Sequence, residues 1–107
     1  MAEEENLAEQ FQFYQQQMQS VMIQKESMML QDAEVGRALE ELKNVNQKNA
    51  YKIIGNIMVS KPVEELRKEL EEAKESIELS IKSLEKSEER IGAKLKELQG
   101  KLKIAGE

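Results

Sequence analysis

The chain has 107 residues and a formal net charge of −5, and 35% of its residues are charged while only 4% are aromatic. Its lysines and arginines are interspersed with carboxylates, so it lacks the clustered positive charge that phosphate binding requires, which excludes a nucleic-acid partner. With no cysteine and no histidine it has no disulfide framework and no thiolate nucleophile. We therefore expect no catalytic residue, no metal site and no cofactor, and we expect a cytoplasmic protein that is not an enzyme.

An uncharged stretch near the N-terminus, residues 11–24, bears on membrane insertion. It contains six glutamines and is therefore neither a transmembrane span nor the apolar region of a signal peptide. Its glutamines are interpreted as a solvated helix face. We expect no membrane partner.

The first half of the chain carries a heptad repeat. An unbroken apolar spine recurs every seven residues at Leu7, Tyr14, Val21, Met28, Val35 and Leu42. This spacing is that of a coiled coil and predicts one helix over about residues 5–47. The companion positions four residues further on include Lys25 and Asp32, so the predicted seam weakens in its middle. Met22 and Met29 lie one residue past the spine and are expected to widen the apolar stripe with flexible side chains.

The second half of the chain repeats this pattern. Its spine consists of Val63, Leu70, Ile77, Leu84, Ile91 and Leu98. The spacing predicts a second helix over about residues 62–104, with Pro62 in its first turn and Ser60 as its N-cap. Gly92 and Gly100 each cost about 1 kcal/mol relative to alanine in a helix, so the last two turns are expected to fray.

Between the two helices, residues 49–60 contain two runs of strand-forming residues separated by Gly55 and Asn56. This arrangement predicts a tight β-hairpin with a primed turn. The expected pairs are Ile54 with Ile57, Ile53 with Met58 and Tyr51 with Ser60. Apolar side chains then occupy both faces, and a lone hairpin is marginal in water, so we expect hairpins of several subunits to join into an intersubunit β-barrel. The oligomerisation hairpin comprises Tyr51, Ile53, Ile54, Gly55, Asn56, Ile57, Met58 and Val59.

The hairpin brings the two helices together as an antiparallel coiled coil, in a register where residue numbers of facing positions sum to about 112. In this register the apolar spines meet, and polar positions also meet: Lys25 faces Ser87 and Asp32 faces Ser80. Matched polar layers disfavour slippage by a heptad. The predicted fold class is therefore mainly α, with two long helices joined by one β-hairpin in a single domain of residues 1–107.

Three of the four aromatic residues lie near the free end of the first helix: Phe11, Phe13 and Tyr14. The register places this end beside the free end of the second helix, and two interpretations remain open. Periodicity makes Phe11 and Tyr14 the last layers of the seam, whereas Phe13 lies off the apolar stripe and indicates an exposed surface that binds unfolded chains. We call this surface the apolar tip and assign to it Leu7, Phe11, Phe13, Tyr14, Met18, Leu98, Leu102 and Ile104.

Residues 51–59, Tyr-Lys-Ile-Ile-Gly-Asn-Ile-Met-Val, resemble the Tyr-Lys-x-x-Gly-Asn-x-x-Val core of the prefoldin beta subunit family. The helix segments 38–42 and 94–99 also resemble this family, and the resemblance extends over residues 9–102. It implies an ATP-independent chaperone hexamer of two alpha-type and four beta-type subunits, held together by barrels of hairpins. It further implies that the apolar tips bind non-native client proteins and deliver them to a group II chaperonin.

The sequence thus predicts a holdase subunit whose weak apolar contacts act together on one flexible client. The alternative is a static coiled-coil oligomerisation or adaptor protein that binds one folded partner. The expected partners are a prefoldin alpha-type subunit, further beta subunits, unfolded clients and the chaperonin.

Overall fold

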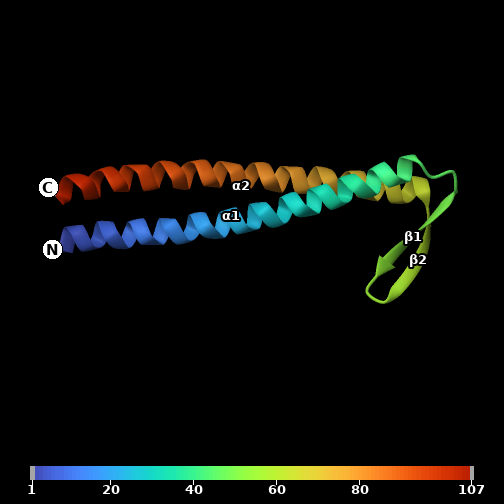
Figure 1. Ribbon diagram of the computed structural model, residues 1–107, viewed down its shortest axis with the longest axis horizontal. Helices are drawn as coiled ribbons and strands as arrows, with labels where there is room; N and C mark the ends of the chain where they lie inside the picture. Colours follow the sequence, from blue (N-terminus) through green and yellow to red (C-terminus); the bar gives the residue numbers. More distant parts are fainter. Residues whose placement is uncertain (1, 107) are drawn as a thin grey trace. The chain divides into compact units, whose positions relative to one another are not determined.

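A computed structural model describes residues 2–106, which form two α-helices joined by a two-stranded antiparallel sheet (Figure 1). Helix α1 spans Ala2–Lys43, strand β1 Asn49–Ile54, strand β2 Ile57–Pro62 and helix α2 Val63–Ala105. The predicted fold class of two long helices joined by one hairpin is confirmed.

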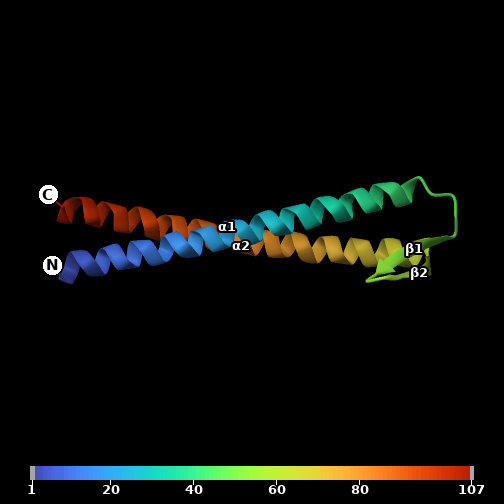
Figure 2. The same ribbon diagram turned by 60° about the horizontal axis from the view of Figure 1, so that its bottom comes forward.

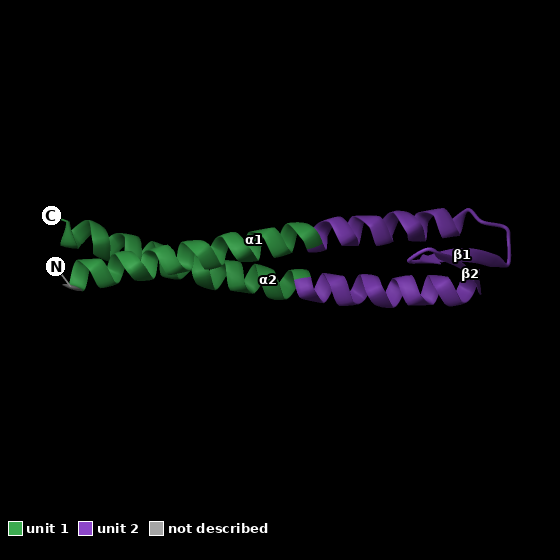
Figure 3. Cartoon of the chain, turned by 90° about the horizontal axis from the view of Figure 1, so that it is seen from below, with its two compact units in different colours: residues 1–27, 81–107 green, residues 28–80 purple. Residues whose placement is uncertain are grey.

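The chain divides into two compact units, and each contains one part of α1 and one part of α2 (Figure 3). Unit 1 holds the described residues up to Ser27 and from Ile81 onward, and its two helix segments run side by side (Figures 1 and 2). Unit 2 is Met28–Ser80 and includes the hairpin.

Burial along α1 follows the predicted heptad. The side chains at the two seam positions are half-buried or buried, whereas most of their neighbours are exposed. These seam residues are Leu7, Phe11, Tyr14, Met18, Val21, Lys25, Met28, Asp32, Val35, Leu39 and Leu42. The sequence period therefore identifies the face of α1 that packs against α2 in each unit.

Three buried side chains form a small core in unit 2. This core and the half-buried residues that pack against it comprise Leu42, Val63, Leu66, Val45, Ala50 and Leu70. It joins the end of α1, the start of α2 and, through Ala50, strand β1. Full burial of a leucine or valine side chain stabilises a fold by roughly 1.5–3 kcal/mol, so this core anchors the hairpin to the helices.

At the polar seam position of unit 1, Lys25 forms ion pairs with two glutamates of α2. The Lys25 Nζ atom lies 3.2 Å from Glu88 Oε2 and 3.9 Å from Glu85 Oε2. The predicted register places Ser87 opposite Lys25, whereas the lysine pairs with the nearby carboxylates of Glu88 and Glu85. A lysine side chain reaches past the residue that faces its Cα atom, which is why the partner was missed.

The polar seam position of unit 2 is also charged. The Lys74 Nζ atom donates a hydrogen bond of 3.0 Å to Asp32 Oδ1, and it lies 3.3 Å from Glu78 Oε1. The hydrogen bond to Asp32 is the main cause that raises the pKa of Lys74. Asp32 therefore pairs with a lysine rather than with the expected Ser80. This pair and the packing of Leu42 in the core show that the two helices run antiparallel in unit 2.

Helix α1 ends at Lys43, before the expected end near residue 47. The Asn44 side-chain amide donates to the Glu40 carbonyl at 3.5 Å, and its backbone N–H donates to the Glu41 carbonyl at 3.2 Å. Asparagine side chains compete with the helix for backbone groups, so Asn44 ends the helix here.

Helix α2 begins at Val63, directly after Pro62 at the end of β2. Ser60 is not its N-cap, because this residue pairs with Tyr51 in the sheet. α2 continues through Gly92 and Gly100 to Ala105, and the Gly106 N–H donates to the Leu102 carbonyl at 2.9 Å. The fraying of the last two turns stays a prediction.

Candidate oligomerisation hairpin and apolar tip

Strands β1 and β2 pair in the predicted register, with Ile54 opposite Ile57 and Ile53 opposite Met58. Gly55 has a φ of 61°, and no non-glycine residue in the described chain has a positive φ. A positive φ at the first turn residue alone is the pattern of a type II′ turn, one of the two primed hairpin turns. The predicted primed turn at the Gly-Asn pair is therefore confirmed.

The two faces of the hairpin differ in burial. Paired residues in an antiparallel sheet share a face, and successive residues alternate between faces. The inner face carries Ala50, Lys52, Ile54, Ile57, Val59 and Lys61, of which Ala50, Val59 and Lys61 are half-buried. The outer face is exposed throughout and carries Asn49, Tyr51, Ile53, Met58, Ser60 and Pro62.

The hairpin exposes an unusual amount of apolar surface for twelve strand residues. Its exposed large apolar side chains are Tyr51, Ile53, Ile54, Ile57 and Met58. Contiguous exposed apolar groups indicate an interaction surface, and the unpaired edges of a two-stranded sheet add free backbone donors and acceptors. The hairpin thus has both the side chains and the backbone groups to join another strand.

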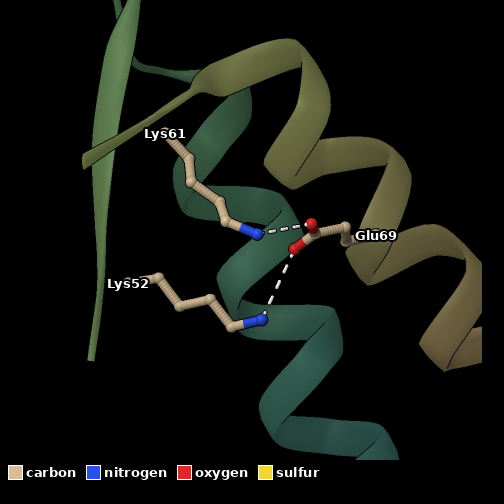
Figure 4. Close-up of polar contacts among 3 residues, drawn as sticks. All are labelled: Lys52, Lys61 and Glu69. Atoms are coloured by element: carbon tan, nitrogen blue, oxygen red, sulfur yellow. Dashed lines mark hydrogen bonds and ion pairs between the residues drawn. The ribbon is translucent and has the colours of Figure 1, made fainter. Parts of the chain in front are cut away.

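An ionic cluster holds the inner face of the hairpin against α2 (Figure 4). The Lys61 Nζ atom donates a hydrogen bond of 2.6 Å to Glu69 Oε1, and the Lys52 Nζ atom donates one of 3.4 Å to Glu69 Oε2. The hydrogen bond from Lys61 is the main cause that lowers the pKa of Glu69, and the same bond raises the pKa of Lys61. One carboxylate therefore links both strands to the helix.

The role of Glu69 was not predicted from the sequence. The available signal was the alternation within the hairpin, since Lys52 and Lys61 occupy the inner face in the predicted register. Two lysines on one face favour an acidic partner, but the sequence does not say which of the glutamates of α2 supplies it. The direction in which the hairpin leaves α2 selects Glu69.

The residues assigned to the apolar tip all lie in unit 1 but differ in exposure. Phe13 is 54% exposed and Ile104 is 76% exposed, whereas Leu98 is only 1% exposed. The half-buried members are Leu7, Phe11, Tyr14, Met18 and Leu102. Leu98 is therefore a seam residue, and Phe13 and Ile104 offer the most surface to a partner.

Two local arrangements shape the apolar tip. The rings of Phe13 and Tyr14 meet edge to face, with centroids 5.4 Å apart and planes at 77°. Leu7 and Ile104 line one groove at the free ends of the helices, together with charged neighbours that include Glu4 and Lys101. Phe11 and Tyr14 are half-buried at seam positions, whereas Phe13 is exposed. The binding of unfolded chains at this end stays a prediction.

Helix α1 also exposes apolar residues next to its seam. Two of them are methionines that were expected to widen the apolar stripe. Met22 and Ile23 in unit 1 are exposed, as are Met29 and Leu30 in unit 2. The methionines do not widen the packed stripe as expected. Each follows a spine residue by one position, and on a helix that packs against a single partner this position faces solvent. The recurrence of Ile23 and Leu30 at a spacing of seven was the signal that could have identified them.

Residues 2–106 offer neither a membrane span nor a metal site. No helix in this range combines the length and the apolar character needed to span a membrane. The same residues contain no group of three or more acidic, histidine or cysteine side chains placed to hold a metal ion. The features that stand out are the hairpin and the apolar surfaces of the helices.

Comparisons with known proteins agree with these features. A family profile described as prefoldin subunit matches residues 5–106. The chain is 41% identical over 101 residues to prefoldin subunit beta of Archaeoglobus fulgidus, covering 92% of this chain and 85% of that one. It is 36% identical over 93 residues to prefoldin subunit beta of Thermococcus onnurineus, covering 86% and 80% of the two chains.

A solved structure supports the same assignment. The crystal structure of the prefoldin beta subunit from Thermococcus strain KS-1 matches with a TM-score of 0.88 and 30% identity, covering 98% of this chain and 93% of that one. The match includes the hairpin between the helices, the feature on which the resemblance of the sequence depended. The chain therefore belongs to the prefoldin family of chaperone subunits, among its beta subunits.

Proposed function

We propose that this prefoldin subunit acts in an ATP-independent holdase, a cytoplasmic hetero-hexamer that binds non-native proteins and delivers them to a group II chaperonin. Its hairpin would join those of an alpha-type subunit and further beta subunits in an intersubunit β-barrel. Its apolar tip would contact the client.

The observation that carries the proposal is the exposed apolar surface at the free ends of the helices. Phe13 is 54% exposed and Ile104 is 76% exposed, in a chain where charged residues are plentiful. Apolar side chains kept in water favour partners that also expose apolar surface, and non-native proteins are the general class that does so.

Multivalency explains how so small a surface can hold a client. One tip offers few side chains, so its affinity for an unfolded chain is low. Several tips in one complex act on the same client, and an effective concentration in the millimolar range raises avidity by about 10²–10⁴ over one contact. No nucleotide is needed for this, because release requires only that individual weak contacts break.

The barrel part of the proposal follows from the hairpin. Its outer face is exposed throughout, and two strands alone are marginally stable in water. Pairing with strands of other subunits would bury Tyr51, Ile53 and Met58 and satisfy the edge backbone groups. This account also explains why an exposed, apolar edge persists: it is covered in the assembled complex.

The function is tested by light scattering from a guanidine-unfolded protein that is diluted into buffer without nucleotide. The complex of this chain with its alpha-type partner is expected to suppress the scattering. The variant Phe13→Ser/Ile104→Ser should lose at least about half of this effect, because two exposed apolar contacts are removed from every beta tip. Both side chains are exposed, so the variant is expected to fold and assemble normally.

The matched control is Leu79→Ser, which removes an equally exposed apolar side chain from α2 in unit 2. It should suppress scattering as well as the unchanged protein does. Equal suppression by the tip variant would contradict the tip assignment. Failure of the unchanged complex to suppress scattering would contradict the holdase function itself.

A further inference from the structure

The apolar core of unit 2 holds the hairpin at its base. Ala50 packs against this core, and the Val63 N–H donates to the Lys48 carbonyl at 2.7 Å, at the open end of the hairpin. Near the turn, Ile54 and Ile57 on the inner face are 54% and 66% exposed. The core therefore fixes where the hairpin leaves the helices but leaves its direction to other contacts.

The contacts that set this direction are mainly ionic. Lys61 on β2 and Lys52 on β1 both donate hydrogen bonds to the Glu69 carboxylate, at 2.6 Å and 3.4 Å (Figure 4). Val59 adds one half-buried apolar side chain between the base and the turn. At 1.5 Å per residue, Glu69 lies about 9 Å along α2 from Val63, so its bonds hold the strands well away from the base.

The three charged side chains lie where dissolved salt can reach them. Lys52 is 43% exposed, Lys61 is 24% exposed and Glu69 is 36% exposed. Partly exposed charges attract each other less as ionic strength rises, because the Debye length falls from about 10 Å at 0.1 M salt to about 3 Å at 1 M. Salt therefore weakens the contacts that direct the hairpin, whereas the apolar core is not weakened by screening.

These ionic contacts leave the joining surface of the hairpin free. The two lysines lie on the inner face, while Tyr51, Ile53 and Met58 on the outer face are exposed. In the described chain the sheet has two strands, so the outer edge of each strand is also open. Holding the hairpin against α2 thus does not compete with its pairing to another subunit.

A hairpin of fixed direction joins a partner more readily than a mobile one. A mobile element loses conformational freedom when it binds, and this loss weakens the association. An element that is already held in its bound arrangement loses less. Several beta-type subunits enter the proposed complex, so a small effect in one chain is repeated in each of them.

We propose that Lys52, Lys61 and Glu69 form an ionic latch that holds the hairpin in the direction in which it joins other prefoldin subunits, so that assembly weakens as ionic strength rises. Glu69 is the positioning residue of this latch, because both lysines bond to it. The latch rests on the proposed intersubunit barrel and adds a salt-sensitive control of its formation.

Sedimentation velocity of this chain with its alpha-type partner tests the latch. The quantity measured is the subunit concentration at which half of the beta chains are in the full complex, at about 0.1 M and about 1 M sodium chloride. Glu69→Gln is expected to raise this concentration at least about threefold at the lower salt. At the higher salt it should differ from the unchanged protein by less than about 1.5-fold, because screening has already opened the latch of both.

Two further variants separate the latch from a general effect of charge. Glu72→Gln removes the same charge from an exposed position of the same helix and should assemble like the unchanged protein at both salt concentrations. Lys61→Met removes the shorter of the two hydrogen bonds and should reproduce most of the effect of Glu69→Gln. The double variant should be little worse than Glu69→Gln alone, because both substitutions remove the same contact.

Two results would overturn the latch. One is equal assembly of Glu69→Gln and the unchanged protein at the lower salt. The other is a defect of Glu69→Gln that persists undiminished at about 1 M salt, since such a defect does not come from a screened ionic contact. A chain that forms no complex with its partner at any concentration would instead overturn the intersubunit barrel, and the latch with it.

Discussion

Single residues in this chain connect elements that the hydrophobic pattern alone would leave loosely joined. Glu69 is the clearest case, because its two carboxylate oxygens accept hydrogen bonds from Lys61 on β2 and Lys52 on β1. An isolated surface pair contributes little, but a carboxylate shared by two lysines orders three side chains at once. Glu69 therefore orients the hairpin relative to α2 rather than adding much to total stability.

We expect Glu69→Gln to loosen the hairpin. Removal of the charge weakens both hydrogen bonds, and exchange of the Val63 N–H, which donates to the Lys48 carbonyl at 2.7 Å, should accelerate by up to about fivefold. Hydrogen exchange measured by NMR checks this. The control Glu72→Gln changes an exposed glutamate of the same helix and should leave the exchange rate as it was. Equal rates in both variants would contradict the role of Glu69.

The cluster also predicts a pH dependence. Hydrogen bonding from Lys61 lowers the pKa of Glu69 below its ordinary value of 4.5 in the folded chain. The stabilisation is therefore present above pH 4.5 and is lost as the pH falls through the lowered pKa. A carboxyl-carbon NMR titration should give Glu69 a midpoint below 4.5, and Lys61→Met should raise this midpoint. A midpoint at or above 4.5 in the unchanged chain would contradict the cluster.

At the scale of elements, the turn of the hairpin depends on one glycine. Gly55 has a φ of 61°, where a side chain with a Cβ atom is strained by roughly 1–2 kcal/mol. Gly100 is different, because it lies inside α2 and no atom outside its helix lies within 4 Å of an added Cβ atom. The two glycines therefore respond in opposite directions to the same substitution.

We expect Gly55→Ala to lower the free energy of unfolding by about 1 kcal/mol and Gly100→Ala to raise it by a similar amount. The first substitution strains the turn, and the second removes backbone freedom from the unfolded chain without steric conflict. Urea denaturation of both variants under matched conditions measures the difference. A stabilised Gly55→Ala variant would contradict the positive φ at the turn.

Periodicity made the elements themselves predictable. Spacing of seven identified the buried face of α1, and the Gly-Asn pair identified the turn and the register of the hairpin. The end of α1 at Lys43 was not predictable to the residue, because it depends on a local bond from Asn44 that competes with helix formation. Ion-pair partners such as Glu88 for Lys25 were also missed, since long side chains reach beyond the facing position.

Exposure was the least predictable property of the candidate sites. The sequence placed Leu98 both on the heptad spine and in the apolar tip, and its burial agrees with the spine; Met22 was expected to widen the apolar stripe and is exposed. A heptad gives the direction of a side chain on its own helix, but burial also depends on how closely the neighbouring helix approaches at that layer. That distance is set by the packing of all the layers of a unit.

At the scale of the whole molecule, a prefoldin subunit assembles with other prefoldin subunits, and the exposed hairpin is the element that we expect to do this. Ile53→Asp places a charge on the outer face without disturbing the isolated chain, because this side chain is exposed. We expect the complex to dissociate into smaller species, since an unpaired charge buried at an interface costs several kcal/mol. Multi-angle light scattering measures the mass, and an unchanged hexamer would contradict the role of the hairpin.

We expect this chain to form a hexamer with its alpha-type partner and to hold non-native protein without nucleotide. Native mass spectrometry tests both parts in one measurement, before and after an unfolded protein is added in equal amount. We predict the mass of two alpha-type and four beta-type subunits, followed by the same mass increased by one client molecule. A smaller complex, or a hexamer whose mass does not change when the unfolded protein is added, would contradict the account.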